Sequence, residues 1–195
     1  MNTDDWLTLI TILGLGSMGL LVCAAFVGII MSSRTVKNFP ALKGKAFSWH
    51  QWSTIIIGSC ILLHSLLSLT TSERTKIIWV NLLVPFTADK ETVWLGLGSM
   101  ALYMMVITIV LSLTIRKKNQ KAWRAMHYGT YILLALALVH GLLISSTFQP
   151  DWKFDFLDAE KVTVEIFGLL LIAAIVYRIR LTLRSSGTAQ KRAAP

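Results

Sequence analysis

The stretch that decides the fold is WLGLGSMALYMMVITIVLSLTI (Trp94–Ile115), which runs for 22 residues without a charged side chain. About 20 apolar residues are needed for an α-helix to cross the hydrocarbon core of a bilayer, so this stretch predicts a transmembrane helix. Further blocks of the same kind occur along the chain, which is 54% hydrophobic and only 15% charged. We expect an all-α integral membrane bundle of about five transmembrane helices, at residues 6–32, 48–70, 93–115, 122–146 and 161–181.

The length of 195 residues suits one domain. We assign residues 1–184 to a single transmembrane domain and expect residues 185–195, which are small, polar and basic, to form a disordered cytoplasmic tail. The N-terminus carries Asp4 and Asp5 and is not basic. The first apolar block is followed by no A-x-A-like cleavage site, so no cleavable signal peptide is predicted.

The net charge of +9 could indicate nucleic-acid binding, but the distribution of the charges favours a membrane topology. If the first helix runs from outside to inside, fourteen of the nineteen Lys and Arg residues lie in cytoplasmic segments, and all ten acidic residues lie outside or near the outer helix ends. This asymmetry follows the positive-inside rule. We therefore expect an integral protein of the bacterial cytoplasmic membrane, with its N-terminus outside and its C-terminus in the cytoplasm. Membrane lipid is an expected partner and nucleic acid is not.

A short motif occurs twice, as LGLGSM at Leu13–Met18 and again at Leu95–Met100. Each copy lies in a helix that precedes a histidine-bearing helix. The echo indicates either two parallel hairpin repeats or a chance similarity between glycine-containing membrane helices, and both readings stay open. The first copy also matches the dinucleotide-binding pattern G-x-G-x-x-G, but that pattern requires a preceding strand and an acidic residue about 20 positions later. Neither fits an apolar span, so we reject it.

The chain contains only four histidines, His50, His64, His127 and His140, and all four lie in the second and fourth predicted spans. The two pairs along the chain are fourteen and thirteen residues apart, or about 21 and 20 Å along a helix. Both spans begin on the cytoplasmic side. His50 and His127 should therefore meet near the inner face, and His64 and His140 nearer the outer face.

Two facing histidine pairs at two depths are what two bis-histidine haems require, because imidazole is a usual axial ligand of haem iron. Ionisable residues inside a membrane point to a function by default. We predict two stacked b-type haems, with the four histidines as iron ligands. The alternatives are that each histidine only bonds to a neighbouring helix, or that zinc or copper binds. The small ions are disfavoured because the two levels are about 20 Å apart, a separation that cannot form one small-ion site.

The thirteen-residue spacing between His127 and His140 does not fit a straight helix. On an ideal helix, two side chains thirteen residues apart point in directions that differ by roughly 140° around the axis, whereas two side chains fourteen residues apart differ by only about 40°. The fourth span must therefore be distorted, or its two ligands approach from different directions. We predict a π-bulge or kink between these histidines, aided by Gly129.

These residues resemble the ferric reductase-like transmembrane domain, which is shared by ferric reductases, NADPH oxidases and the haem subunit of the periplasmic methionine sulfoxide reductase system. The resemblance covers about residues 10–180. The matching stretches are Trp49-His50 with His64, Val84-Pro85-Phe86 before Trp94–Gly98, Ser112, and Trp123-Arg124-Ala125-Met126-His127 with His140-Gly141. The resemblance implies that His50 and His127 ligate an inner haem, that His64 and His140 ligate an outer haem, and that electrons flow outward.

In ferric reductases and NADPH oxidases a flavin domain follows the membrane helices, and family members often carry a sixth helix; we expect neither in this chain. We therefore expect it to bind no FAD or NAD(P) and to receive electrons from a separate reductase, a quinol or another subunit of a redox complex. Arg124, one turn before His127, is the first candidate to neutralise inner haem propionates, followed by Lys45 and Arg34. Arg74 and Lys76 are weaker candidates on the outer side. The lysines are explained equally well as charges that set the topology.

The expected function is transmembrane electron transfer by a di-haem b-type cytochrome, from a cytoplasmic or quinol donor to an extracytoplasmic acceptor. Whether the chain is itself an enzyme, as a ferric reductase-like oxidoreductase component, stays open. A cytochrome b subunit that anchors a larger redox complex is the first alternative. A non-haem membrane scaffold or small transporter is the second.

Overall fold

The computed structural model describes residues 3–32, 40–70, 84, 93–147 and 159–193, and every regular element among them is a helix. The helices are α1 (Thr3–Ser32), α3 (Pro40–Thr70), α5 (Val93–Thr114), α6 (Gln120–His127), α7 (Gly129–Thr147) and α8 (Ala159–Ala193). Five spans in this part of the chain are long and apolar enough to cross a membrane: Asp5–Met31, Ala41–Ser68, Val93–Thr114, Gln120–Ile144 and Ala159–Leu181. The predicted all-α bundle of five membrane helices is confirmed.

The boundaries differ from the sequence prediction at two helix ends. α3 begins at Pro40 and not near residue 48, since proline suits the first turn of a helix, where no backbone N–H donor is needed. α8 continues to Ala193, so residues 185–193, for which we expected a disordered tail, are helical. This segment contains Ala, Gln, Lys and Arg, which favour helix, and it contains no proline before Pro195.

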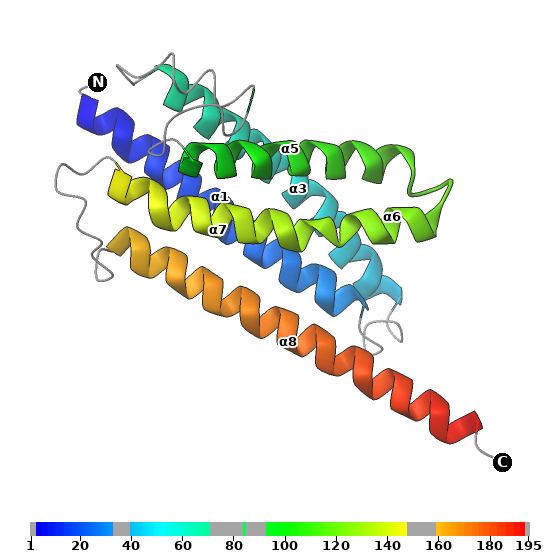
Figure 1. The fold of residues 1–195 in the computed structure, drawn as a ribbon. Helices are drawn as coiled ribbons and strands as arrows, with labels where there is room; N and C mark the ends of the chain where they lie inside the picture. Colours follow the sequence, from blue (N-terminus) through cyan, green and yellow to red (C-terminus); the bar gives the residue numbers. More distant parts are fainter. Residues whose placement is uncertain (1–2, 33–39, 71–83, 85–92, 148–158, 194–195) are drawn as a thin grey trace.

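The helices form two antiparallel hairpins and one additional helix (Figure 1). α1 packs along α3, and α5 packs along α7, while α8 lies against α1 and α7. The two hairpins meet mainly through α1 and α7. By contrast, the backbones of α3 and α7 make little direct contact with one another, although these are the helices that carry three of the four histidines.

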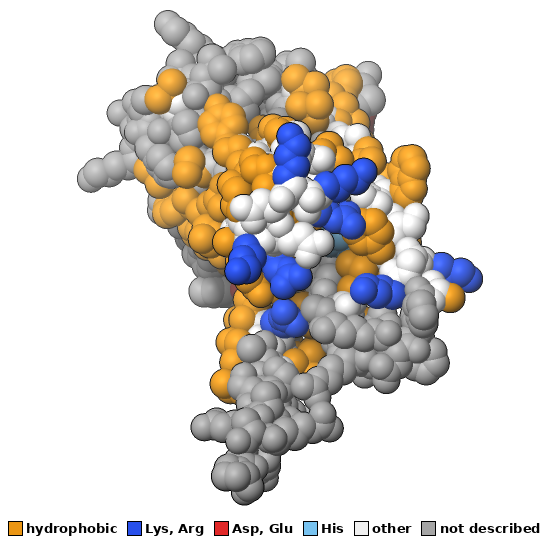
Figure 2. Space-filling view, turned by 90° about the vertical axis from the view of Figure 1, so that its right-hand side faces the viewer, with side chains coloured by type: hydrophobic (Ala, Val, Ile, Leu, Met, Phe, Trp, Pro, Cys, Tyr) orange, Lys and Arg blue, Asp and Glu red, His pale blue; other side chains and the backbone are white. Residues whose placement is uncertain are grey.

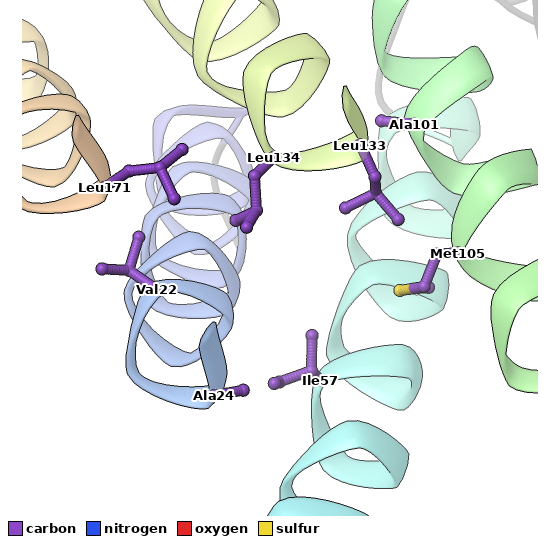
Figure 3. Close-up of a cluster of buried hydrophobic side chains, with 8 residues drawn as sticks. All are labelled: Val22, Ala24, Ile57, Ala101, Met105, Leu133, Leu134 and Leu171. Atoms are coloured by element: carbon purple, nitrogen blue, oxygen red, sulfur yellow. The ribbon is translucent and has the colours of Figure 1, made fainter. Parts of the chain in front are cut away.

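A cluster of buried apolar side chains fills the middle of the bundle (Figure 3). Ile57 lies seven residues from both His50 and His64 along α3, and Leu133 occupies the corresponding middle position of α7. The remaining members are Val22, Ala24, Ala101, Met105, Leu134 and Leu171. This middle layer therefore separates the two histidine levels with hydrocarbon. Large apolar side chains also cover the outside, such as Leu113 at 73% exposure, as expected of surfaces that face lipid.

The fourth span is interrupted at Tyr128, between α6 and α7. The Tyr128 N–H donates to the Arg124 carbonyl at 3.1 Å, but the Tyr131 N–H donates to the Tyr128 carbonyl, only three residues back, also at 3.1 Å. The interruption predicted between His127 and His140 is thus present, directly before Gly129. Its tight three-residue bond makes it a break of the 3₁₀ kind and not a π-bulge.

Charges divide between the two ends of the bundle. Figure 2 shows Lys and Arg side chains gathered at the end that carries the α5–α6 turn, which we name the basic end. Its described members are Lys43, Lys45, Arg116, Lys117, Lys118, Lys121, Arg124, Arg178 and Arg180. The acidic side chains that the structure describes, Asp5, Glu160 and Glu165, lie in the first turn of α1 and the first two turns of α8, at the opposite end. The side chains of Arg34, Lys37, Arg184, Lys191 and Arg192 lie outside the described residues.

Candidate functional site

The four histidines lie at two levels, as the sequence predicted. His50 and His64 lie on α3, His127 is the last residue of α6, and His140 lies on α7. The ring centres of His50 and His127 are 6.2 Å apart, with the ring planes at 76°; we name these two residues the basic-end pair. His64 and His140 are close enough to interact electrostatically and form the opposite-end pair.

Both rings of the opposite-end pair are held by a backbone carbonyl of the preceding helix. His64 Nδ1 lies 2.9 Å from the Ile10 carbonyl oxygen of α1, and His140 Nδ1 lies 2.8 Å from the Trp94 carbonyl oxygen of α5. A carbonyl can only accept, so Nδ1 must carry the proton in both residues. In the neutral ring Nε2 then keeps its lone pair. A backbone carbonyl bound to Nδ1–H is also what orients histidines that ligate metals.

A glycine four residues after each carbonyl makes room for the ring. A Cβ atom built on Gly14 would lie 3.1 Å from His64 Cε1, and one built on Gly98 would lie 2.8 Å from both Cε1 and Nδ1 of His140. A side chain at either position would therefore press against the imidazole and force the ring or the helix to shift. The carbonyl and the glycine together form a cradle that fixes the position of the ring on its neighbouring helix.

His50 of the basic-end pair has a looser version of the same cradle. Its ring lies beside the backbone of Ala24, and a Cβ on Gly28, four residues later, would be 3.8 Å from His50 Cε1. Its Nδ1 nevertheless makes no hydrogen bond to any residue that the structure describes, so the ring lies beside the carbonyl without an aligned bond. α1 thus offers a carbonyl and a glycine at positions 10 and 14 and again at 24 and 28.

His127 has a different environment. Its ring is stacked on that of Trp123, one turn earlier in α6, with the ring centres 5.1 Å apart and the planes at 24°. The Trp123 Nε1–H donates to Ser112 Oγ on α5 at 3.1 Å. His127 Nδ1 is buried and has no hydrogen-bond partner among the described residues.

Two arginines lie close in sequence to residues of the basic-end pair or its neighbours, and their side chains have different surroundings. Arg124 is exposed, and its guanidinium is directed at Gln120 Oε1, 3.5 Å away on its own helix. Arg116, which we did not single out, lies with Cζ 4.1 Å from the centre of the Phe47 ring and 5.9 Å from that of Trp123. Its position at the end of the third span made it look like one more topology-setting charge.

Other charged candidates fall into three groups. Lys45 is exposed. Arg34, Arg74 and Lys76 lie outside the described residues. Lys161, near the start of α8, is fully buried at 0% exposure. Nothing in the sequence singled it out, because it directly follows the charged residues of the preceding loop.

The ring separation of the basic-end pair is compatible with axial ligation of a porphyrin iron. Metal–imidazole bonds of about 2 Å, with about 1 Å from the bonded nitrogen to each ring centre, separate two opposed axial rings by about 6 Å. The 6.2 Å separation in the basic-end pair matches this span. α3 and α7 stay apart, as a macrocycle between them requires. No group of three or more His, Cys, Asp and Glu side chains that could hold a metal ion occurs in the described parts, so the histidines form pairs and not a cluster.

The two copies of the LGLGSM motif do not occupy equivalent positions relative to the histidines. His64 contacts Gly14, the first glycine of its copy, whereas His140 contacts Gly98, the second glycine of its copy. The two hairpins therefore share a cradle, but the motif copies are offset from it by two residues. The repeated letters alone are not evidence for structurally equivalent positions.

The fold and the histidine sites together define the class of the molecule: a polytopic α-helical membrane protein with two intramembrane histidine pairs. Comparison of the chain with models of protein families, with curated proteins and with solved structures finds no match.

Proposed function

We propose that this protein is a di-haem b-type cytochrome that conducts electrons across a membrane. The observation that carries the proposal is the meeting of imidazoles from α3 and from α6–α7 at two levels, with ring centres 6.2 Å apart at the basic end and the two helices held apart. The resemblance of the histidine-bearing stretches to the ferric reductase-like transmembrane domain supports the same function.

The protein's part in this chemistry is to hold and orient four imidazoles. Carbonyls of Ile10 and Trp94 fix the proton of His64 and His140 on Nδ1, which leaves Nε2 free to bind iron. A bound haem supplies one-electron exchange between ferric and ferrous iron. The apolar middle layer around Ile57 keeps water from the space between the two levels.

The charge asymmetry supports the orientation of this conduit in the membrane, and the resemblance to the ferric reductase-like domain implies outward electron flow. By the positive-inside rule the basic end faces the cytoplasm, which puts the N-terminus outside and the C-terminus inside a bacterial cytoplasmic membrane. Electrons then enter at the level of His50 and His127 and leave at the level of His64 and His140. The extracytoplasmic acceptor, in a ferric reductase-like role, is iron or another oxidant.

The electron donor in this proposal is a separate reductase, a quinol or another subunit of a redox complex. Arg124 stays a candidate for neutralising the propionates of the haem at the basic end. Arg116 is a second candidate, since its guanidinium lies over aromatic rings beside both ligand-bearing helices.

The test is the haem content of the purified protein, measured as the pyridine haemochrome, together with a reduced-minus-oxidised spectrum. We expect two b-type haems per chain in the wild type and one in His64→Ala, with the haem at the basic end retained. An unchanged count in His64→Ala would contradict the ligand assignment. Absence of b-type bands in the wild type would leave only a membrane scaffold.

The same preparation separates an independent conduit from a membrane anchor. Reduction of a ferric chelate by the isolated chain, once it is chemically reduced, supports a reductase of its own. Stoichiometric co-purification of a catalytic subunit, without such turnover, supports the cytochrome b anchor of a larger complex.

A further inference from the structure

His127 lacks the carbonyl and glycine cradle that holds His64 and His140, and it also lacks the glycine contact of His50. His64 and His140 are hydrogen-bonded to carbonyls and lie against glycines, and His50 lies against Gly28 beside Ala24. For His127 the structure gives neither a carbonyl bond nor a glycine contact among the described residues. An axial ligand must be held in orientation by its surroundings, so another group has to do this for His127.

Trp123 contacts the His127 ring over a wide area. The two rings are nearly parallel, at 24°, with centres 5.1 Å apart, an offset-stacked geometry that restricts rotation of the imidazole. One turn along a helix brings such side chains together. The indole is itself fixed, because its N–H donates to Ser112 Oγ on α5, 3.1 Å away.

Arg116 covers this arrangement from the basic end. Its guanidinium lies within cation–π range of Trp123 and closer to Phe47. Phe47 is one turn before His50 on α3. The contacts of Arg116 therefore join the helix that carries His50 to the helix that carries His127, at the level of the basic-end pair.

We infer that Trp123 is a positioning residue for His127, anchored across the bundle by Ser112 and covered by Arg116, and that it replaces the carbonyl and glycine cradle of the other histidines. This inference rests on the proposed haem ligation. It goes beyond that proposal because it assigns the orientation of His127 to the side chains of Trp123, Ser112 and Arg116. The rings of the opposite-end pair are instead oriented by backbone carbonyls.

The network can be tested by asking whether carbon monoxide displaces His127. Two held imidazoles leave no open position on the iron, so the reduced wild type should not bind carbon monoxide. In Trp123→Leu the His127 ring is no longer held in place, so carbon monoxide should displace it from the iron. One of the two haems should then form a carbon monoxide complex. Ser112→Ala should give the same complex in a smaller fraction of molecules, and Ser112→Thr, which keeps the hydroxyl, should restore the wild-type behaviour.

Trp52→Leu is the matched control, because Trp52 is two residues after His50 but 64% exposed. It should behave as the wild type. Electron paramagnetic resonance of the oxidised variants in a His64→Ala background, where only the haem of the basic-end pair is expected, identifies the affected site. Its low-spin signal should shift in Ser112→Ala.

The outcomes separate the two proposals. Two haems, no carbon monoxide complex and an unshifted signal in both Trp123→Leu and Ser112→Ala would overturn the positioning role while leaving haem ligation intact. Loss of one haem from Trp123→Leu, with both retained in Trp52→Leu, supports it. A wild type without haem overturns the proposed function itself.

Discussion

Replacing Gly98 by alanine is the sharpest test of the cradle at the opposite-end pair. The new Cβ would lie 2.8 Å from two atoms of the His140 ring, whereas nonbonded carbon atoms prefer about 3.5–4.0 Å. The ring or the helix must therefore move by about 0.7 Å or more. Such a movement breaks the 2.8 Å bond from Nδ1 to the Trp94 carbonyl.

The expected cost follows from these two effects. Overpacking of a close contact costs about 1–3 kcal/mol, and loss of the hydrogen bond costs about 1 kcal/mol. Alanine recovers about 0.5–1 kcal/mol through its better helix propensity. Gly98→Ala should thus be less stable than the wild type by about 1–3 kcal/mol. Under the proposed function it should also bind less haem.

A graded glycine series supplies the controls. Cβ atoms at Gly14 and Gly28 would lie 3.1 and 3.8 Å from the nearest histidine atom, and a Cβ at Gly16 would meet nothing within 4 Å. The damage should therefore fall in the order Gly98, Gly14, Gly28, and Gly16→Ala should be neutral or stabilising by up to about 1 kcal/mol. Unfolding by sodium dodecyl sulfate in mixed micelles measures stability, and the pyridine haemochrome measures haem. Equal stability and equal haem content in Gly98→Ala and Gly16→Ala would refute the reasoning.

Three further predictions concern the packing, capping and topology of the bundle. Ile57→Ala should lower the free energy of unfolding by about 2–5 kcal/mol, because Ile57 is 1% exposed. Ile55→Ala should change it little, because Ile55 is 56% exposed; equal losses of the two variants in mixed-micelle unfolding would argue against a packed middle layer. Asn119 caps α6 by accepting from the Ala122 N–H at 3.0 Å, so Asn119→Ala should cost about 1 kcal/mol and Asn119→Asp much less, with no difference between the two contradicting the cap. In intact cells an impermeant maleimide should label a cysteine in place of Glu160 but not one in place of Lys118, and the reverse pattern would invert the proposed topology.

Much of the architecture could be predicted from hydropathy and spacing. The run from Trp94 to Ile115 contains no charge, and an uncharged segment of this length can cross a bilayer only as a helix. The thirteen-residue spacing of His127 and His140 predicted either a distortion or two directions of approach, and the structure has an interruption at Tyr128. These inferences succeed because helix rise and rotation are local properties of the chain.

The type of that distortion and the environment of each ring depend on contacts between helices. The choice between a π-bulge and a tight break depends on how α6 and α7 each pack on α5, and the sequence does not contain that packing. Arg116 resembles its neighbours in sequence, and only the approach of α3 to the α5–α6 turn places Phe47 beneath it. Arg124, closer to His127 along the chain, lies on an exposed face.

The sequence by itself determined the number of spans, the levels of the histidines and the division of charge between the two ends, since each depends on counting residues along one helix. The tertiary structure decided which glycine and which carbonyl hold each imidazole, and that Trp123 stands in for both at His127. The reason is that these contacts join separate helices: the two carbonyl contacts connect residues 54 and 46 positions apart in sequence, and the Trp123 contact crosses to α5 through Ser112. Their distances are set by how closely two helices approach and not by the periodicity of either one.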